Sequence, residues 1–433
     1  MSTTVEPPSS RSAGRPSREP GESRTSPTAR EPAEAAEPRT GRFAWFAAVR
    51  EALDKPLTAY YLLLGASGLL LTIGLIMVLS ASSVYSFRVF DNSYAIVTRQ
   101  LMWVALGLPA AYVASRMSTR WLKRLAFPAY LVALVLLLMT AFLGVTVNGN
   151  QNWLALGPIQ IQPSEIAKLA LVIWAAATYA NKERRLGQLH QIMVPVVPGL
   201  LLATALVVVG RDLGTALVFM AILLGLLWVV GAPARFFTFS LSILSVLAIF
   251  IASTSSERLG RITNFVDPFQ DYHDAGWQPA HGLYALSTGG VFGQGIGASQ
   301  QKWGDLPEAH TDFIFAVLGE ELGLVGTLLV VGLFLTIAYA ALRVARETAD
   351  PFVRYCTFGI VVWLIGQMII NVGMVLALLP VIGIPLPLVS YGGSALLPSL
   401  VALGLLIGFA RREPEAARAL AHRKRERGRS LVG

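Results

Sequence analysis

Long apolar runs recur along this chain and are separated by shorter polar connections. Most runs hold roughly 18 or more residues, enough for a helix to cross about 30 Å of hydrocarbon, and the fourth is shorter. The runs are continuous rather than alternating, and in lipid only helices or closed barrels satisfy their own backbone, so the pattern predicts helices. We expect an all-α polytopic membrane protein with about ten transmembrane helices, at Tyr61–Ser80, Ile96–Ser115, Leu125–Gly144, Ile166–Ala180, Met193–Val209, Leu213–Val230, Phe236–Ser253, Phe313–Leu342, Tyr355–Leu379 and Leu388–Ala410.

The composition agrees with a membrane domain and predicts three parts. The chain of 433 residues is 54% hydrophobic and only 14% charged, whereas an average soluble domain is about 25% charged. Residues 1–55 are rich in Pro, Ser, Arg and Glu and lack apolar periodicity, which predicts a disordered tail. Residues 56–412 form the predicted membrane domain, and residues 413–433 form a second, basic tail.

The basic residues predict the topology. The net charge of +9 could suggest nucleic acid, but the bases collect in alternate connections and in the C-terminal tail, namely at Arg116–Arg124, Lys182–Arg185, Arg235, Arg343–Arg346 and from Arg411 onward. The positive-inside rule makes that side cytoplasmic, so we expect both termini in the cytoplasm and no nucleic-acid partner. The opposite connections are then external. The longest, residues 254–312 between the seventh and eighth helices, is predicted to be ordered because it is rich in Gly, aromatic and polar residues.

Two carboxylates near the end of that connection are the strongest candidates for chemistry. Pro307 is predicted to open a helical turn in which Glu308 and Asp312 stand four residues apart and share a face. Asp312 directly precedes an apolar run, and a partly desolvated carboxylate has a raised pKa that suits a general base. The structural alternative is an acidic residue that complements the helix dipole. A metal site at His310 has only weak support, because no Cys or second His lies near.

Other polar residues flank the external helix ends. Glu165 and Lys168 are three residues apart and can pair, and Ser164 could cap their helix. Glu320 and Glu321 lie deeper and are expected to pair with buried partners. The candidates for substrate binding are Glu165, Lys168, Glu308, Lys302, Arg211 in a tight turn, and Ser390, which follows a Pro-containing break before the last helix.

Several of these segments resemble the SEDS family of membrane proteins, which includes the FtsW and RodA types. The resemblance runs from about Pro56 to Arg412. It rests on Gln301-Lys302, Leu306-Pro-Glu-Ala-His-Thr-Asp-Phe-Ile-Phe-Ala-Val, Gly319-Glu-Glu-Leu-Gly, Ser80-Ala-Ser-Ser, Gln162-Pro-Ser-Glu-Ile-Ala-Lys, Asp212-Leu-Gly-Thr, Asn371-Val-Gly-Met and Pro387-Leu-Val-Ser-Tyr-Gly-Gly-Ser. The chain departs from the family pattern at Gln151 and Asn152, where arginines are common, at Gly210-Arg211, where Gln-Pro is common, and at Ile382, where many FtsW-type members have a lysine.

The resemblance implies an inverting peptidoglycan glycosyltransferase that polymerises lipid II at the outer face of a bacterial plasma membrane. The family's essential aspartate carries over to Asp312. Our own mechanistic hypothesis makes Asp312 the general base, has Glu308 tune it or hold an ion such as Mg²⁺ or Mn²⁺, and takes Lys302 and Arg211 as candidate cations for the leaving diphosphate. The N-terminal tail and Leu79-Ser-Ala-Ser-Ser look more similar to FtsW-type members. That implies septal synthesis in cell division, with a class B penicillin-binding transpeptidase, other divisome membrane proteins and membrane lipids as partners.

Three other functions stay open at this point. A lipid II flippase would also have many helices with internal carboxylates, although it should show inverted repeats, and none is visible. A RodA-type polymerase of cell elongation would perform the same chemistry elsewhere in the cell. A non-catalytic scaffold would tolerate substitution of Asp312 but not loss of its tails.

Overall fold

The computed structural model describes residues 55–430, apart from 148–149, 158, 239, 241, 243–244, 247–266 and 270–275, and in the last helix it describes side chains up to residue 422. The predicted disordered tail at residues 1–55 lies almost wholly outside the described residues, and so does most of the predicted span Phe236–Ser253. Both therefore stay predictions.

Helices account for most of the described chain, as the apolar runs predict. They are α2 (Thr58–Phe90), α3 (Ala95–Arg116), α4 (Thr119–Leu143), α5 (Pro163–Asn181), α6 (Leu189–Met193), α7 (Val196–Val209), α8 (Leu213–Val229), α11 (Trp277–Gly289), α12 (Ile314–Glu347), α13 (Pro351–Val375), α14 (Gly393–Arg412) and α15 (Pro414–Ser430). Every predicted span except Phe236–Ser253 overlaps one or two of these helices. The basic C-terminal tail is helical in α15.

Length and apolar composition make this a multi-pass membrane protein. Among the described residues, seven helical segments are long and apolar enough to cross a bilayer: α2, α3, α4, α6 with α7, α12, α13 and α14. Helix α8 is apolar but shorter, and α5 begins with the charged residues Glu165 and Lys168. The described residues thus contain seven full-length spans and not the ten expected. Two of the predicted runs fold into shorter or more polar helices, and a third, Phe236–Ser253, lies mostly outside the described residues.

The connection between α4 and α5 is a small antiparallel sheet that the all-α prediction did not include. Its strands β1 (Val145–Val147), β2 (Asn150–Leu156) and β3 (Ile159–Ile161) lie in the order β1-β2-β3. Gly157 allows the turn between β2 and β3, since its φ of 62° favours a residue without a side chain. Runs this short are missed by a search for membrane-spanning segments.

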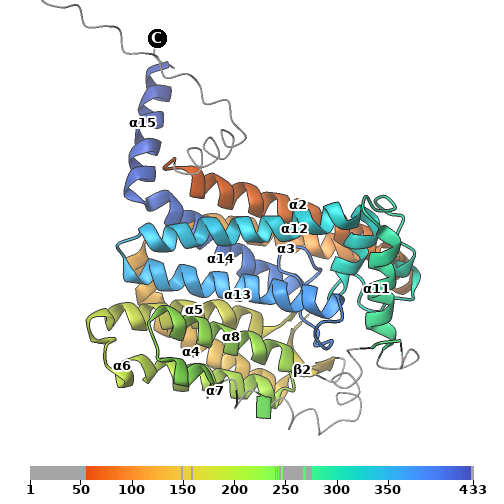
Figure 1. Cartoon of the computed structure of the whole chain (residues 1–433), viewed down its shortest axis with the longest axis horizontal. Coiled ribbons are helices and arrows are strands. Elements are labelled where there is room, and N and C mark those ends of the chain that lie inside the picture. The colour runs from red at the N-terminus through yellow and green to blue at the C-terminus, as the bar shows by residue number, and fades with distance from the viewer. Residues whose placement is uncertain are drawn as a thin grey trace, which may run out of the picture. The chain divides into compact units, whose positions relative to one another are not determined.

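Small residues let α14 pack closely against α3. A Cβ atom added at Gly404 would lie 2.3 Å from the carbonyl oxygen of Ala111, and one at Gly408 would lie 2.5 Å from that of Ser115. Glycine at such contacts allows two backbones in a membrane to approach, which increases their van der Waals contact. In Figure 1, α12, α13 and α14 run side by side along the upper part of the molecule, above α4, α5, α7 and α8.

The chain between α13 and α14 is non-helical, and it brings the Pro-rich segment into the bundle. The predicted last span began at Leu388, but Leu388 has a positive φ of 65° and α14 begins only at Gly393. The two prolines at 385 and 387 account for this break, because proline lacks a backbone donor and disfavours a helical residue before it. The segment packs against α2, where a Cβ at Gly74 would lie 2.2 Å from the carbonyl oxygen of Leu388.

The described part of the long connection is ordered and joins the start of α12. After α11, backbone N–H groups of Gln294 and Gly295 donate to the carbonyl oxygens of Glu320 and Glu321, at 2.9 and 3.0 Å. These carbonyls need partners because α12 is interrupted at Gly323, which has a φ of 68°. The connection therefore supplies hydrogen bonds that the interrupted helix lacks, and it is held against the membrane domain.

Candidate functional site

Asp312 lies between the long connection and α12, two residues before the helix begins. Its side chain is half-buried. Burial, followed by the negative charges of Glu308 and Asp212, raises the pKa of Asp312 to about 7. A carboxyl group with this pKa exchanges a proton readily near neutral pH, which is the property that a general base requires.

The backbone around Asp312 is held by α13 and by the segment before α14. The Asn371 side-chain amide donates to the carbonyl oxygens of Asp312, at 2.8 Å, and of Ile384, at 2.7 Å. The Ser390 hydroxyl donates to the carbonyl oxygen of Thr311 at 2.7 Å. The backbone N–H of Tyr391 donates to the carbonyl oxygen of His310 at 2.9 Å. Predicted as a substrate-binding residue, Ser390 thus has a structural contact that fixes the position of the aspartate.

Gly383 lies directly beside the carboxylate of Asp312. A Cβ atom added at Gly383 would lie 3.3 Å from Oδ2 of Asp312, and the φ of Gly383 is 72°. Both observations favour glycine, since a side chain would be strained and would crowd the carboxylate. The adjacent Ile382 stands where many FtsW-type members have a lysine, and it packs against the apolar core.

Glu308 influences Asp312, but not through the helix that the spacing predicted. Residues 307–313 form turns, and Glu308 has a positive φ of 55°. The predicted helical turn is therefore wrong, because a residue with positive φ cannot continue a right-handed helix. The backbone N–H groups of Thr311 and Phe313 both donate to the carbonyl oxygen of Glu308, at 3.1 Å, and the Thr311 hydroxyl donates to its Oε2 at 2.5 Å.

Asp212 is the third acidic residue of the site, and the sequence analysis did not select it. It caps α8: its carboxylate accepts hydrogen bonds from the backbone N–H and the hydroxyl of Thr215, both at 2.9 Å. It also accepts from the side-chain amides of Asn152, at 3.2 Å, and Gln162, at 3.3 Å. The signal that could have identified it is the Asp-Leu-Gly-Thr motif at the start of an apolar run, which has the form of an N-cap.

Two of the departures from the family pattern, at Gln151-Asn152 and at Gly210-Arg211, lie beside Asp212. The backbone N–H of Gln151 donates to the carbonyl oxygen of Gly210 at 2.9 Å, next to the contact of Asn152 with Asp212. Arg211 is exposed in this turn and has a φ of 62°. Arg211 therefore directly precedes Asp212 in the chain and is exposed to solvent.

Lys302 is buried in an ionic network instead of facing solvent. Its ammonium donates to Oε1 of Glu321 at 2.9 Å, to the Ser80 hydroxyl at 3.0 Å, and to the carbonyl oxygen of Gly297 at 2.7 Å. These contacts use the three donors of an ammonium group. In this arrangement Lys302 fastens the long connection to α2 and α12 and has no donor left for a diphosphate.

The adjacent Glu320 is also paired within the protein. Its carboxylate accepts hydrogen bonds from the Ser299 hydroxyl, at 2.5 Å, and from the backbone N–H of Gln300, at 2.9 Å. The prediction that Glu320 and Glu321 have buried partners is confirmed.

Glu165 and Lys168 form a buried ion pair at 2.8 Å in the first turns of α5. Ser164 does not cap this helix: α5 begins at Pro163, and the structure assigns no side-chain cap. Glu165 and Ser390 both line a small cavity of about 10 Å³, which is about the room that one water molecule needs. The structure thus brings these two predicted residues together, but in a space too small for a sugar.

Aromatic and basic residues surround His310. The ring centroids of Tyr85 and Tyr391 lie 5.1 and 5.8 Å from that of His310. Burial lowers the pKa of His310, against the opposing effect of Glu308. Arg99 hydrogen-bonds the Tyr391 side chain and also lies over the ring of Phe90, at 4.9 Å. Arg99 was missed by the sequence analysis, because a single basic residue at the start of a membrane helix resembles an ordinary interfacial charge.

The described residues contain no cluster of three or more His, Cys, Asp or Glu side chains suited to a metal ion. The negative charge of Glu308 raises the pKa of Asp312, so the two carboxylates interact, and carboxylate oxygens are the ligands that Mg²⁺ prefers. The pair could therefore supply part of a site that a diphosphate would complete.

Curated relatives match most of the chain. The "Probable peptidoglycan glycosyltransferase FtsW" of Mycobacterium tuberculosis is 40% identical over 387 residues, which cover 89% of this chain and 72% of the relative. The "Stage V sporulation protein E" of Bacillus subtilis is 35% identical over 348 residues, which cover 79% of this chain and 94% of the relative.

Solved structures agree with these relatives. A chain from a structure titled "Structural coordination of polymerization and crosslinking by a peptidoglycan synthase complex" has a TM-score of 0.66 and 28% identity, over 81% of this chain and 97% of that chain. The rod shape determining protein RodA of Thermus thermophilus has a TM-score of 0.61 and 28% identity, over 82% and 97%. The family model of FtsW, RodA and SpoVE, described as "Cell cycle protein", matches residues 61–414. The chain therefore belongs to the FtsW, RodA and SpoVE family of cell cycle proteins.

Proposed function

We propose that this chain is a peptidoglycan glycosyltransferase of the FtsW type, which polymerises lipid II with Asp312 as the general base. The relatives named as FtsW glycosyltransferases support the reaction class, since they are 35–40% identical to this chain. Three observations support the role of Asp312: its carboxylate is half-buried, its backbone is held by hydrogen bonds, and its pKa is raised to about 7.

The reaction that fits this site is an inverting glycosyl transfer. The 4-hydroxyl of the acceptor sugar attacks the anomeric carbon of the donor, and the proton of that hydroxyl passes to a carboxylate oxygen of Asp312. The bond from the anomeric carbon to the diphosphate oxygen breaks, and the lipid diphosphate leaves with the electron pair. General-base catalysis of this kind accelerates a reaction by about 10²–10⁴-fold.

The leaving diphosphate requires positive charge near the donor. Arg99 and Arg211 are exposed basic residues that start or precede membrane helices, and they are better candidates than Lys302 because Lys302 donates all its hydrogen bonds internally. A divalent ion held by Glu308 would neutralise part of the same charge. Glu165, Lys168 and Ser390 support the site by packing, through the ion pair at 2.8 Å and the contact of Ser390 with Thr311.

The proposed orientation places Asp312 outside the cytoplasm. The basic connections at Arg116–Arg124 and Lys182–Arg185 lie at the opposite helix ends, and basic residues favour the cytoplasmic side. Both termini are then cytoplasmic. A related chain belongs to a complex that coordinates polymerization and crosslinking, which supports a class B penicillin-binding transpeptidase as partner at the division septum, alongside other divisome membrane proteins.

Polymerisation of lipid II by the purified chain tests the proposal. The full chain, with its transpeptidase partner, is compared with Asp312→Asn, which preserves shape and removes the base. Asp305→Asn is the matched control, because Asp305 is exposed in the same connection. We expect the first variant to lose about 10²-fold or more of its rate and the control to keep it. A folded, partner-bound Asp312→Asn protein that polymerises lipid II at the normal rate overturns the assignment of the base. If the purified chain moves lipid II across the membrane of liposomes without polymerising it, the proposal that the chain is a glycosyltransferase is overturned.

A further inference from the structure

A cavity of about 490 Å³ lies between α4, α5 and α7, far from Asp312. It is lined by the first turns of α4, by the C-terminal half of α5 and by the start of α7. From Lys123, which lines the cavity, α4 runs to Leu143 over roughly 30 Å, at 1.5 Å per residue, and the sheet that follows it contacts Asp212 in the site. The cavity therefore belongs to the opposite end of the helices, and its volume is in the range of ligand pockets, about 300–1,000 Å³.

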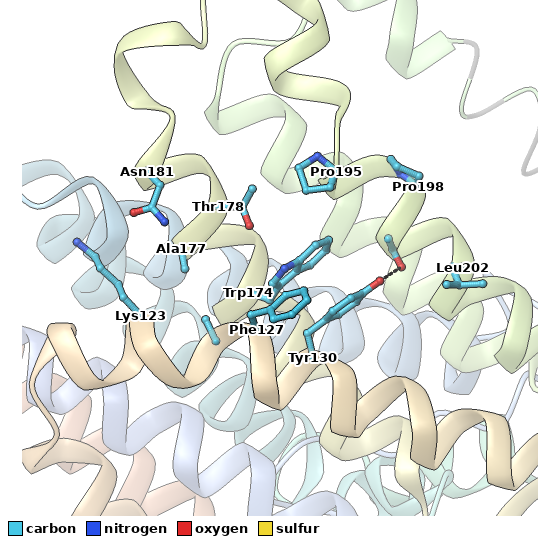
Figure 2. A pocket seen from close by; sticks show the side chains of 12 residues that line it. Lys123, Phe127, Tyr130, Trp174, Ala177, Thr178, Asn181, Pro195, Pro198 and Leu202 are labelled. Atoms are coloured by element: carbon cyan, nitrogen blue, oxygen red, sulfur yellow. Dashed lines mark hydrogen bonds between the residues drawn. The ribbon is translucent and has the colours of Figure 1, made fainter.

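The cavity is polar at one end and apolar at the other. Figure 2 shows Lys123 and Asn181 together on one side and Leu202 on the other, with Trp174 and Phe127 between them. Phe127 and Leu202 are 56% and 51% exposed, as expected for side chains that face lipid in a membrane protein. This gradient matches an amphiphile that lies along the helices with its head at the Lys123 end.

The wall of the cavity is rigid. The rings of Tyr130 and Trp174 stack with their centroids 3.9 Å apart, and the Tyr130 hydroxyl donates to the carbonyl oxygen of Gly199 at 3.2 Å. A Cβ atom at Gly199 would lie 2.3 Å from the Trp174 ring, so α7 can approach this stack only with glycine there. The cavity is therefore bounded by fixed surfaces, which suits a defined ligand.

One lysine, Lys123, lines the polar end of the cavity. Lys123 is anchored by Asp350, whose Oδ1 accepts its hydrogen bond at 3.0 Å, and an ammonium group has two further donors. Lys182 does not line the cavity, but it donates to the carbonyl oxygen of Val194 at 2.7 Å, next to Pro195, which does. Among the residues that line it, Lys123 is the only charged one. Asp350 balances the charge of Lys123, and the remaining donors of the Lys123 ammonium are what the cavity offers to an anionic head group.

We propose that this cavity binds an anionic glycerophospholipid, with its phosphate at Lys123 and Asn181 and an acyl chain against Phe127 and Leu202. Under the proposed orientation the ligand comes from the cytoplasmic leaflet, where anionic lipids attract basic residues. The site is distinct from the one at Asp312.

Native mass spectrometry of the purified full chain tests this, with phosphatidylglycerol and phosphatidylcholine of identical acyl chains as probes. Lys123→Gln removes the charge that lines the cavity, and Arg120→Gln is the matched control from the same exposed turn, outside the cavity. Leu202→Trp fills the apolar end. Its matched control is Leu201→Trp, since Leu201 is 44% exposed and does not line the cavity.

We expect the unmodified chain to retain one phosphatidylglycerol more tightly than phosphatidylcholine. Lys123→Gln should weaken phosphatidylglycerol roughly tenfold, as expected for the loss of one charged hydrogen-bond partner, and Leu202→Trp should remove one bound lipid. Equal retention of the two lipids, equal weakening by Arg120→Gln, or undiminished binding in Leu202→Trp would each overturn the proposal. The Leu202 pair decides the matter if Lys123→Gln does not fold, and no readout depends on polymerisation.

Discussion

The charge of Glu308 should set the pH at which this protein begins to polymerise. Three effects raise the pKa of Asp312 from 3.8 to about 7: burial, the charge of Glu308 and the charge of Asp212. Glu308→Gln removes the second effect and leaves the other two. It also keeps an oxygen that can accept the hydrogen bond from the Thr311 hydroxyl. The pKa of Asp312 in the variant should therefore lie between 3.8 and about 7.

The magnitude follows from the fraction of Asp312 that is ionised, since only the carboxylate can accept a proton. With a pKa of about 7, about one tenth of the protein is ionised at pH 6 and about nine tenths at pH 8. The rate of the unmodified protein at pH 6 should be roughly one tenth of its rate at pH 8. In Glu308→Gln the ratio of these two rates should rise toward one.

The assay is lipid II polymerisation by the partner-bound chain across pH 5 to 8. The ratio of rates at two pH values is used because it cancels any uniform loss of activity in the variant. Asp305→Asn is the control, because it removes a negative charge from the exposed part of the same connection and should leave the ratio unchanged.

Two results would refute this reasoning. If the rate of the unmodified protein does not fall between pH 8 and pH 5, then no carboxyl group with a raised pKa acts as the base. If the rate falls but Glu308→Gln and Asp305→Asn give the same profile as the unmodified protein, then Glu308 does not act on Asp312.

Three further predictions concern stability and backbone strain. Because folding raises the pKa of Asp312, ionisation of Asp312 opposes folding as the pH rises. Asp312→Asn should therefore raise the free energy of unfolding by at most about 4 kcal/mol at pH 8 and by little at pH 4. Chemical denaturation in detergent measures both values. Lys302→Met should leave Glu321 buried without its 2.9 Å partner and lower stability by about 3–5 kcal/mol, seen as a reduced Tm. Gly383→Ala, at a φ of 72°, should cost about 1 kcal/mol and reduce kcat by crowding Asp312, whereas Gly332→Ala in α12, with nothing within 4 Å, should do neither.

Each of these has an outcome that would contradict it. A pH-independent stability difference for Asp312→Asn would mean that its ionisation is not linked to folding. An unchanged Tm in Lys302→Met would mean that the network around Glu321 is accessible to water. Full activity in Gly383→Ala would show that the space beside the Asp312 carboxylate is not needed.

The membrane architecture was readable from the sequence because lipid imposes a simple rule. A backbone without water must form its own hydrogen bonds, so long apolar runs become helices, and α2, α3, α4, α12 and α13 lie where those runs predicted. The rule did not predict the structure of short or polar segments. The strands β1–β3 form through local hydrogen bonds between short segments, and prolines interrupt the chain before α14.

The site was only partly readable. The sequence identified Asp312 through its motif and its position before an apolar run, but it placed Glu308 on a helix that does not form. It also assigned Lys302 to the substrate, whereas the structure pairs Lys302 with Glu321. An ion pair between residues that are distant in the chain leaves no periodic pattern in the sequence. The sequence therefore cannot distinguish a lysine that binds a ligand from a lysine that pairs with a buried carboxylate.

The amino-acid sequence alone is enough to show that this chain is a helical membrane protein and that an acidic residue directly precedes the apolar run of α12. Folding determines what surrounds that acid, because Asp212, Asn371 and Gly383 come to it from other parts of the chain. The physical reason is that a pKa depends on burial and on charges that are near in space. Helix formation depends on neighbours along the chain, whereas the chemistry of Asp312 depends on neighbours brought to it by folding.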